Sequence, residues 1–139
     1  PTGFVSGGCV LISRKALEVV GPLEERYFVY WEDTDWSAQA LRHGLDLYWR
    51  PDAMVVHKVS QALGVNSPTY LYYFYRNNLL FIERNTPQGK RWLAKLVYNK
   101  NLCREIVKVL LRSKGSRITS LAMLWRARND YRKRRFGKL

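Results

Sequence analysis

The sequence predicts an α/β domain over residues 1–85, followed by a basic helical appendage over residues 86–139. Three observations support this division. Two short apolar runs, at residues 9–13 and 53–56, have the length and composition of buried strands. Apolar side chains recur at helical spacing from residue 92 onward. The charge balance also changes, from slightly acidic in the first part to strongly basic in the second.

Local signals place helices between these segments. Ser13 has the side chain of a helix N-cap, and Gly21 and Gly44 are typical of helix ends. Thr86-Pro87-Gln88-Gly89 interrupts a helical pattern. The expected elements, in chain order, are a helix over 14–20, an irregular aromatic segment over 23–31, a helix over 33–43, extended segments over 45–58, a loop over 64–68 and helices over 69–85, 92–111 and 118–131, with a turn over 113–116 between the last two.

The size and charge of the chain restrict its class. A chain of 139 residues is the length of one ordinary domain, and it is long enough to bury a core. Residues 1–83 carry 7 basic and 9 acidic side chains, whereas residues 84–139 carry 17 basic and 2 acidic ones. A segment with a net charge of +15 favours an anionic neighbour such as a membrane surface, a nucleic acid or another protein.

The remaining composition argues against several classes of protein. Cys9 and Cys103 lie far apart in the sequence, so neither a disulfide framework nor a Cys metal pair is indicated, and a reducing compartment is expected. No apolar run approaches the roughly 18 residues of a membrane-spanning helix, and no signal-peptide pattern occurs. The chain begins at Pro1, close to an apolar segment, so we expect it to be a fragment of a longer protein.

The first candidate site is the acidic segment Trp31-Glu32-Asp33-Thr34-Asp35-Trp36. Three carboxylates within four positions repel one another when ionised, which favours proton uptake or a nearby cation. The alternative is that Asp33 or Asp35 simply caps the following helix. The sequence leaves both interpretations open.

Two weaker signals flank this segment. His57 ends an apolar run and could bind a metal ion or a phosphate, or it could be a histidine at the edge of the core. Gly7 and Gly8 would allow close approach of a ligand to the backbone, but they would equally allow a tight turn.

The order of these features is more specific than any one of them. It runs from Gly7-Gly8 through Gly21-Pro22-Leu23 and the Glu-Asp segment to His57 and Arg76-Asn77. Over about residues 3–85 this order resembles the C-terminal half of the catalytic domain of family-2 glycosyltransferases, with rhamnosyltransferase-like members most similar. These are inverting enzymes of the GT-A fold that use nucleotide-sugar donors. The fold class that the resemblance implies is the C-terminal part of a GT-A fold followed by amphipathic helices.

The resemblance implies a role for each candidate residue. Asp33 would be the general base that removes the proton of the acceptor hydroxyl. Support of the acceptor or the base would fall to Trp31, Glu32, Asp35 and Trp36. Gly7 and Gly8 would form the donor-side backbone, and His57 would help to bind the metal–diphosphate group. The metal would be Mn²⁺ or Mg²⁺. The alternative for Trp36 is plain core packing.

Two departures from the family pattern stand out. Members often carry an arginine near the position of Gln39, but here none occurs before Arg42. The nucleotide-binding half and its Asp-x-Asp metal motif are also absent, so we expect this chain alone to be inactive. A non-catalytic binding module, with basic helices that hold an anionic membrane or a partner, is the alternative function.

The basic appendage indicates which binding partner to expect. Its two amphipathic helices favour an anionic membrane surface, which suits a lipid-linked acceptor and a cytoplasmic enzyme at the inner face of the membrane. Packing of its apolar stripes on the rest of the enzyme is the alternative. A nucleic acid is disfavoured, because no nucleic-acid-binding motif is present. The implied substrates are a nucleotide-sugar donor and a saccharide or lipid-linked acceptor in cell-surface polysaccharide assembly.

Overall fold

The computed structural model of the chain describes residues 1–56, 64, 66–111 and 117–139. Its helices, in chain order, are α1 (Arg14–Val20), the 3-10 turn η1 (Glu25–Tyr27), α2 (Glu32–Arg42), α3 (Pro68–Asn85), the 3-10 turn η2 (Gln88–Lys90), α4 (Arg91–Leu111) and α5 (Arg117–Arg132). The predicted helices are therefore confirmed, with boundaries within two residues.

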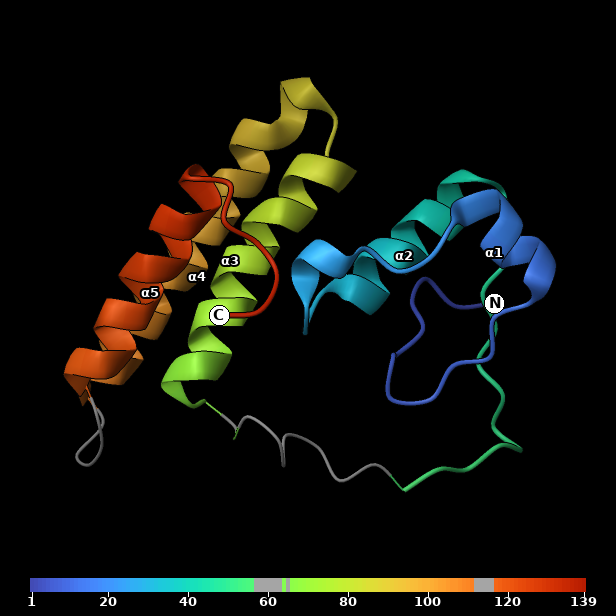
Figure 1. Cartoon of the computed structure of the whole chain (residues 1–139), viewed down its shortest axis with the longest axis horizontal. Helices are drawn as coiled ribbons and strands as arrows, with labels where there is room; N and C mark the ends of the chain where they lie inside the picture. The colour runs from blue at the N-terminus through green and yellow to red at the C-terminus, as the bar shows by residue number, and fades with distance from the viewer. Residues whose placement is uncertain (57–63, 65, 112–116) are drawn as a thin grey trace.

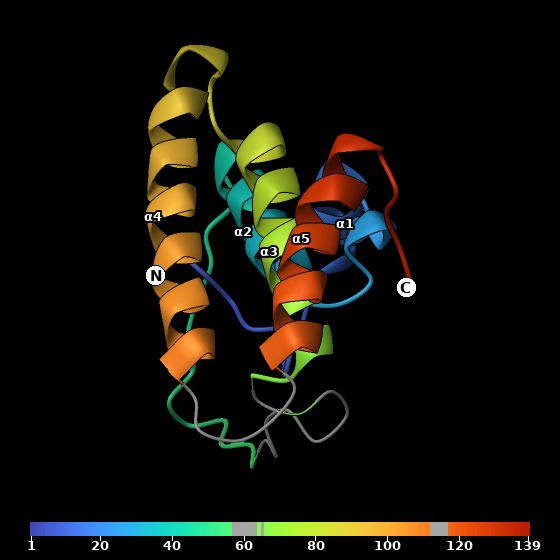
Figure 2. The same ribbon diagram turned by 90° about the vertical axis from the view of Figure 1, so that its left-hand side faces the viewer.

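The helices form two groups (Figure 1). The long helices α3, α4 and α5 lie side by side as a bundle, and α3 contacts both of the others. Helices α1 and α2 lie on the other side of α3, and the irregular N-terminal segment passes beside them. Figure 2, turned by 90°, shows α3 between α4 and α5 with α2 behind it. The sequence assigned α3 to the first domain, and in the structure this helix contacts both groups. The predicted domain boundary at residue 85 stays a prediction.

The bundle buries a continuous apolar core. Helix α3 begins with the Ser67 N-cap, whose hydroxyl accepts from the Tyr70 N–H at 3.0 Å, and it has Pro68 in its first turn, where a missing N–H costs nothing. Its aromatic side chains face both neighbours. The buried core residues are Leu71, Tyr72, Tyr73, Tyr75, Leu79, Ile82, Tyr98, Leu102, Val109, Leu124 and Ala127.

The N-terminal group has a much smaller core, made of Trp36, Ala40 and Leu47. Its helix α1 has no fully buried residue, although the predicted Ser13 cap is present and accepts from the Ala16 N–H at 3.2 Å. Gly21, with φ of 85°, ends that helix in a conformation that favours glycine. Local capping, rather than burial, defines this helix.

The predicted strands at residues 9–13 and 53–56 are wrong for this structure. Within residues 1–56, 64, 66–111 and 117–139, the ladder contacts are limited to one isolated antiparallel bridge between Thr2 and Leu47. A strand needs a neighbouring strand to pair its N–H and C=O groups, and the described residues supply none for these segments. Their apolar side chains are accordingly exposed, with Leu11 at 98% and Val56 at 93%.

Among the residues that the structure describes, no helix is both long and apolar enough to cross a membrane.

Candidate functional site

The acidic segment lies at the start of α2, directly after an unusual loop. Phe28, Tyr30 and Trp31 have φ angles of 65°, 64° and 77°, which lie in the left-handed region. Such angles are uncommon for residues other than glycine and carry a conformational cost. Trp31 is the last residue before α2, so Glu32 and Asp33 occupy the first turn of the helix. The loop therefore sets where these two carboxylates point.

Two buried polar residues of α3 hold this loop. The Asn77 side-chain amide donates to the carbonyls of Tyr27, Val29 and Tyr30 at 2.9, 2.7 and 3.0 Å. The Arg76 guanidinium donates to the Tyr27 carbonyl at 3.1 Å. Because both side chains are almost fully buried, these bonds form away from water, where an unpaired carbonyl would be costly.

The Asp33 carboxylate is fixed from both sides. Its Oδ2 accepts from the Gly7 backbone N–H at 2.9 Å, and its Oδ1 accepts from the Thr34 N–H at 2.7 Å. Gly7 lies in contact range of the Asp33 side chain, because a Cβ added to Gly7 would be 3.4 Å from the Asp33 Cβ, an ordinary van der Waals distance. The structure thus brings together two residues that are 26 positions apart and were singled out independently from the sequence. Each carboxylate oxygen keeps acceptor capacity for a further donor.

Glu32 and Trp31 lie beside this carboxylate in a half-buried environment. Burial, with a smaller contribution from the charge of Asp33, raises the pKa of the Glu32 carboxyl above its ordinary value. The Trp31 ring packs against Phe74 and Phe81 of α3, at centroid distances of 5.3 and 5.1 Å. Within the described residues, neither Glu32 Oε2 nor Trp31 Nε1 has a hydrogen-bond partner.

Asp35 is turned toward α3 and away from solvent. It is 2% exposed and accepts from the Tyr27 hydroxyl at 3.0 Å and from the Arg84 Nε at 3.0 Å, with the Asn85 amide as a third donor. Burial and the nearby Asp35 carboxylate keep the pKa of the Tyr27 hydroxyl well above its ordinary value. Asp35 therefore joins α2 to α3 through a buried ion pair.

Trp36 belongs to the small N-terminal core. Its side chain is 5% exposed, and its indole N–H donates to the Gly21 carbonyl at 2.9 Å. A ring in this position cannot stack on a sugar without unpacking the core. The structure thus favours the packing alternative for Trp36 over the acceptor-side role.

The other predicted site residues are placed less completely. Gly8 is in a turn, where its N–H donates to the Ser6 hydroxyl at 3.3 Å. His57 lies outside the described residues. No group of three or more His, Cys, Asp and Glu side chains is placed to hold a metal ion in the part of the chain that the structure describes. The described residues alone therefore do not form a metal site.

Sequence reasoning missed the supporting roles of Arg76, Asn77 and Arg84. A signal for the first two was present, because an Arg-Asn pair stands among aromatic residues in the middle of an otherwise apolar helix. Charged and amide side chains at such positions are rarely buried without partners. No local pattern indicated that the partner of Arg84 would be Asp35, which lies 49 positions earlier.

Comparison with known proteins bears on this arrangement. The chain is 32% identical over 82 residues to N-acetylglucosaminyl-diphospho-decaprenol L-rhamnosyltransferase from two strains of Mycobacterium tuberculosis, a match that covers 59% of this chain and 27% of the relative. It is 30% identical over 89 residues to the dTDP-rhamnosyl transferase RfbF of Shigella flexneri, which covers 58% of this chain and 30% of the relative. No protein-family model matches the chain, and no solved structure matches it significantly.

The chain thus spans less than a third of the length of these curated relatives. The extent of the match agrees with the resemblance inferred over about residues 3–85, which is some 60% of the chain. Over the 82–89 matched residues, the sequence is similar to rhamnosyltransferases, as its motifs predicted.

Proposed function

We propose that this chain is the acceptor-side part of an inverting, family-2 glycosyltransferase with a GT-A fold. The enzyme would transfer a rhamnosyl group from a nucleotide-diphosphate donor to a saccharide or lipid-linked acceptor in cell-surface polysaccharide assembly. The observation that carries the proposal is the fixed Asp33 carboxylate, held by the Gly7 and Thr34 N–H groups at the start of α2. Similarity to curated rhamnosyltransferases supports the same reaction class.

Asp33 acts as the general base in this proposal. The acceptor hydroxyl donates its hydrogen bond to a free lone pair of the carboxylate, and the proton passes to Asp33 as the oxygen attacks the anomeric carbon. The new carbon–oxygen bond forms on the face opposite the nucleotide, while the bond between that carbon and the diphosphate oxygen breaks. Backbone N–H donors hold the carboxylate in one orientation, which reduces the entropy lost on reaching the reactive geometry.

The neighbouring residues would support this base in different ways. The half-buried Glu32 and Trp31 border the carboxylate and would contact an acceptor. Asp35 would act indirectly, because its buried contact with Arg84 fixes the position of α2. Gly7 and Gly8 would border the donor sugar.

A divalent cation, Mn²⁺ or Mg²⁺, is part of the proposal, and His57 is the ligand that this chain would contribute. When bound, the ion would offset the charge that develops on the leaving diphosphate. The described residues do not assemble its site.

The experiment is a transfer assay on the intact protein that contains this chain, with dTDP-rhamnose as donor. Asp33→Asn should lower the transfer rate by about 10²–10⁴-fold, the usual contribution of a general base, while donor binding measured by calorimetry is retained. The control is Asp46→Asn, since Asp46 is an exposed acid whose carboxylate accepts from the Tyr48 hydroxyl at 3.4 Å. Full turnover by Asp33→Asn would rule out the assigned base.

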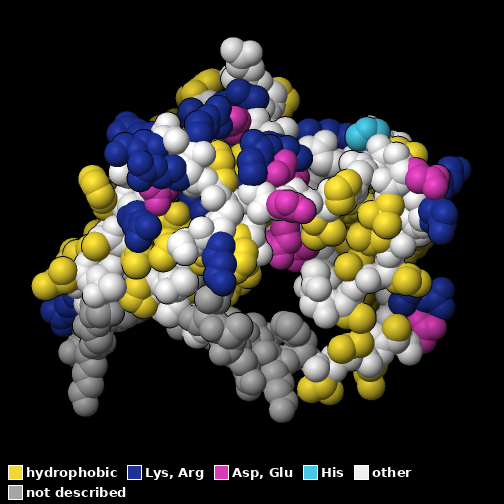
Figure 3. All heavy atoms as spheres, in the orientation of Figure 1, with side chains coloured by type: hydrophobic (Ala, Val, Ile, Leu, Met, Phe, Trp, Pro, Cys, Tyr) yellow, Lys and Arg dark blue, Asp and Glu magenta, His cyan; other side chains and the backbone are white. Residues whose placement is uncertain are grey.

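We also propose that the enzyme works at the inner, cytoplasmic face of an anionic membrane, and the outward face of α4 supports this. Apolar side chains recur there at helical spacing and are 47–78% exposed: Trp92, Leu93, Leu96, Val107, Leu110 and Leu111. Lys100 and Arg104 lie among them, whereas the single acid of α4, Glu105, is buried. Figure 3 shows further Lys and Arg side chains gathered over the half of the molecule that contains α5. Apolar residues flanked by cations match an anionic lipid surface.

Vesicle co-sedimentation tests the membrane proposal. The intact protein should bind vesicles that contain phosphatidylglycerol more tightly than vesicles of phosphatidylcholine. Leu96→Gln should weaken this binding by about tenfold, which corresponds to removing one apolar side chain from the lipid boundary. Leu11→Gln is the matched control, because Leu11 is 98% exposed in the N-terminal group. Equal binding to both vesicle types would contradict the proposal and favour packing of α4 on another part of the protein.

A further inference from the structure

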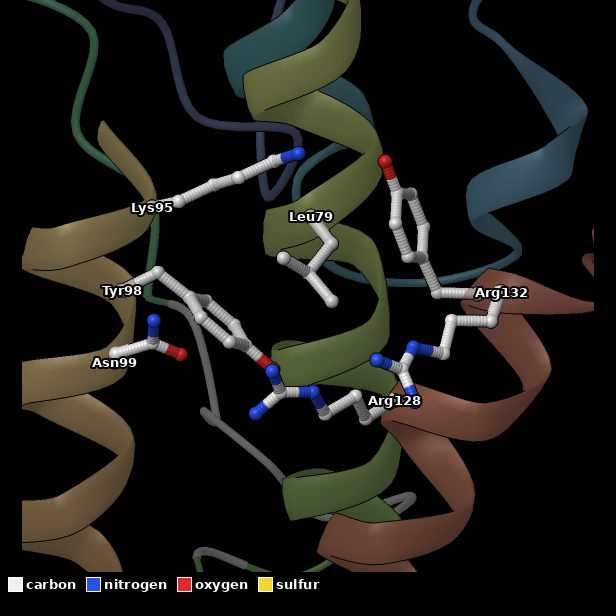
Figure 4. A pocket seen from close by; sticks show the side chains of 7 residues that line it. Leu79, Lys95, Tyr98, Asn99, Arg128 and Arg132 are labelled. Carbon is white, nitrogen blue, oxygen red and sulfur yellow. The ribbon is translucent and has the colours of Figure 1, made fainter. Parts of the chain in front are cut away.

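A second candidate site lies in the bundle, apart from the acidic segment. Residues of α3, α4 and α5 form a cavity of about 160 Å³ that is open to solvent and is lined by Leu79, Lys95, Tyr98, Asn99, Arg128, Tyr131 and Arg132 (Figure 4). None of these residues belongs to α2 or to the loop that holds Asp33. The cavity is therefore separate from the residues that the proposed transfer reaction uses.

Three cationic side chains line this cavity without an acidic partner. Lys95, Arg128 and Arg132 form no ion pair in the described residues, and no Asp or Glu is among the lining residues. Other arginines of the same region are paired, since Arg126 contacts Asp130 at 3.3 Å and Arg134 contacts Glu83 at 2.7 Å. All three side chains are exposed, and an anion bound in the cavity would interact favourably with each of their charges.

A buried hydroxyl at the same place is an independent indication of a ligand. Tyr98 is 4% exposed, and its hydroxyl has no hydrogen-bond partner within the described residues. Burial raises the pKa of this hydroxyl to about 12, so it is protonated and able to donate at neutral pH. Buried hydroxyls are normally paired, because an unmade hydrogen bond costs free energy. Figure 4 shows the Tyr98 hydroxyl and the Arg128 guanidinium pointing toward each other across the cavity.

We propose that this cavity binds a phosphate group, with Arg128, Arg132 and Lys95 neutralising its charge and the Tyr98 hydroxyl and Asn99 amide donating hydrogen bonds. Phosphate oxygens accept several hydrogen bonds at once, and arginine presents a planar pair of donors that matches them. A cavity of about 160 Å³ has room for a phosphate or a diphosphate. The group could be that of a free diphosphate or of a lipid headgroup, since both present the same oxygens.

The test is a titration of the full chain followed by NMR, with inorganic pyrophosphate as the probe and sodium chloride at equal ionic strength as the reference. Saturable shifts are expected at the backbone amides of Tyr98 and Asn99 and at the Nε of Arg128. Arg128→Gln should weaken binding by about tenfold, the effect of losing one charge-assisted hydrogen bond. Tyr98→Phe, which keeps the ring in the core, should weaken it by about threefold to tenfold.

The matched control is Arg14→Gln, which removes the same charge from α1, where Arg14 is exposed. Its affinity should stay within about twofold of the unchanged protein, since screening in solution weakens distant charges. A loss in Arg14→Gln equal to that in Arg128→Gln would overturn the proposal, because binding would then be nonspecific. Unchanged binding by both Arg128→Gln and Tyr98→Phe, or shifts that do not saturate, would overturn it as well.

A second titration with water-soluble short-chain phosphatidic acid distinguishes the two sources. Binding at least about tenfold tighter than that of pyrophosphate would support the phosphate site and assign it to a lipid headgroup. Equal or tighter binding of pyrophosphate would support the site and assign it to a free diphosphate. Neither result depends on transfer activity, so failure of the phosphate site and failure of the Asp33 assignment are separate outcomes.

Discussion

The bundle and the N-terminal group are stabilised in different ways. Helices α3, α4 and α5 bury a continuous set of apolar side chains, whereas the N-terminal group has three buried core residues of its own. The N-terminal group contacts α3 through aromatic rings, such as Trp31 against Phe74, and through polar contacts made by Asp35 to Arg84 and by Asn77 to the loop carbonyls. The candidate base is therefore positioned by buried hydrogen bonds together with aromatic packing.

This difference has a physical reason. The loop before α2 has three residues with left-handed φ, a conformation that local sequence preferences disfavour. Apolar packing has no direction and cannot select such a backbone, whereas hydrogen bonds to particular carbonyls can. Substitutions in the two regions should therefore differ in the kind of interaction that they remove and in how much unfolding free energy they cost.

The largest effect is expected for Asp35→Asn. It removes the charge that Arg84, the Tyr27 hydroxyl and the Asn85 amide contact, and Glu24 remains as the acidic partner of Arg84. Loss of one member of a buried pair costs about 3–5 kcal/mol of unfolding free energy, measured by urea denaturation. The control, Asp52→Asn, breaks a solvent-exposed pair with Arg50 and should change the unfolding free energy little. Similar losses in both variants would show that Asp35 is not the link between α2 and α3.

Leu124→Ala tests the apolar core of the bundle. Leu124 is 3% exposed, so the substitution leaves a cavity, and a loss of about 2–5 kcal/mol in unfolding free energy is expected. Ile118→Ala, on the same helix but at an 85% exposed position, should change it little. A small loss in Leu124→Ala would mean that the bundle is not packed as described.

Asn77→Ala tests the polar contacts of the loop. It removes the Asn77 donor from three carbonyls, of which that of Tyr27 keeps its hydrogen bond from Arg76, and a loss of about 1–3 kcal/mol in unfolding free energy is expected. Transfer by the intact protein should fall further than stability alone explains, because the loop positions Asp33. Asn101→Ala, at an exposed site on α4, is the control. An unchanged transfer rate in a folded Asn77→Ala protein would show that the loop does not position Asp33.

The smallest effect is a pH dependence from Glu24. The hydrogen bond from Arg26, opposed by burial, lowers the pKa of the Glu24 carboxyl to about 2 from an ordinary value of 4.5. A lowered pKa in the folded state contributes stability above pH 4.5 that is lost as the pH falls toward 2. Unfolding free energy should therefore decrease through this range, and the decrease should be shallower in Glu24→Gln. Identical slopes in the two proteins would rule out this contribution.

The sequence predicted the helices well because their signals are local. The Ser13 cap, the glycine stops and the apolar period of residues 92–111 each act within one or two turns. The strands at 9–13 and 53–56 failed because a strand depends on partners that a local pattern cannot specify.

The candidate site was predictable in part. The Glu-Asp segment and Gly7 were identified by resemblance, and the structure places the Gly7 N–H against Asp33. The same pattern could not distinguish the buried roles of Asp35 and Trp36 from exposed ones, because burial depends on contacts with distant residues such as Arg84. The supporting contacts of Asn77 are likewise long-range.

The most direct test measures transfer rate and unfolding free energy for Asp33→Asn and Asp35→Asn in the same intact protein. The account predicts that Asp33→Asn loses transfer by about 10²–10⁴-fold with little change in stability, whereas Asp35→Asn loses stability first. Transfer retained by Asp33→Asn, or a stability loss as large as that of Asp35→Asn, would contradict the assignment of Asp33 as the base.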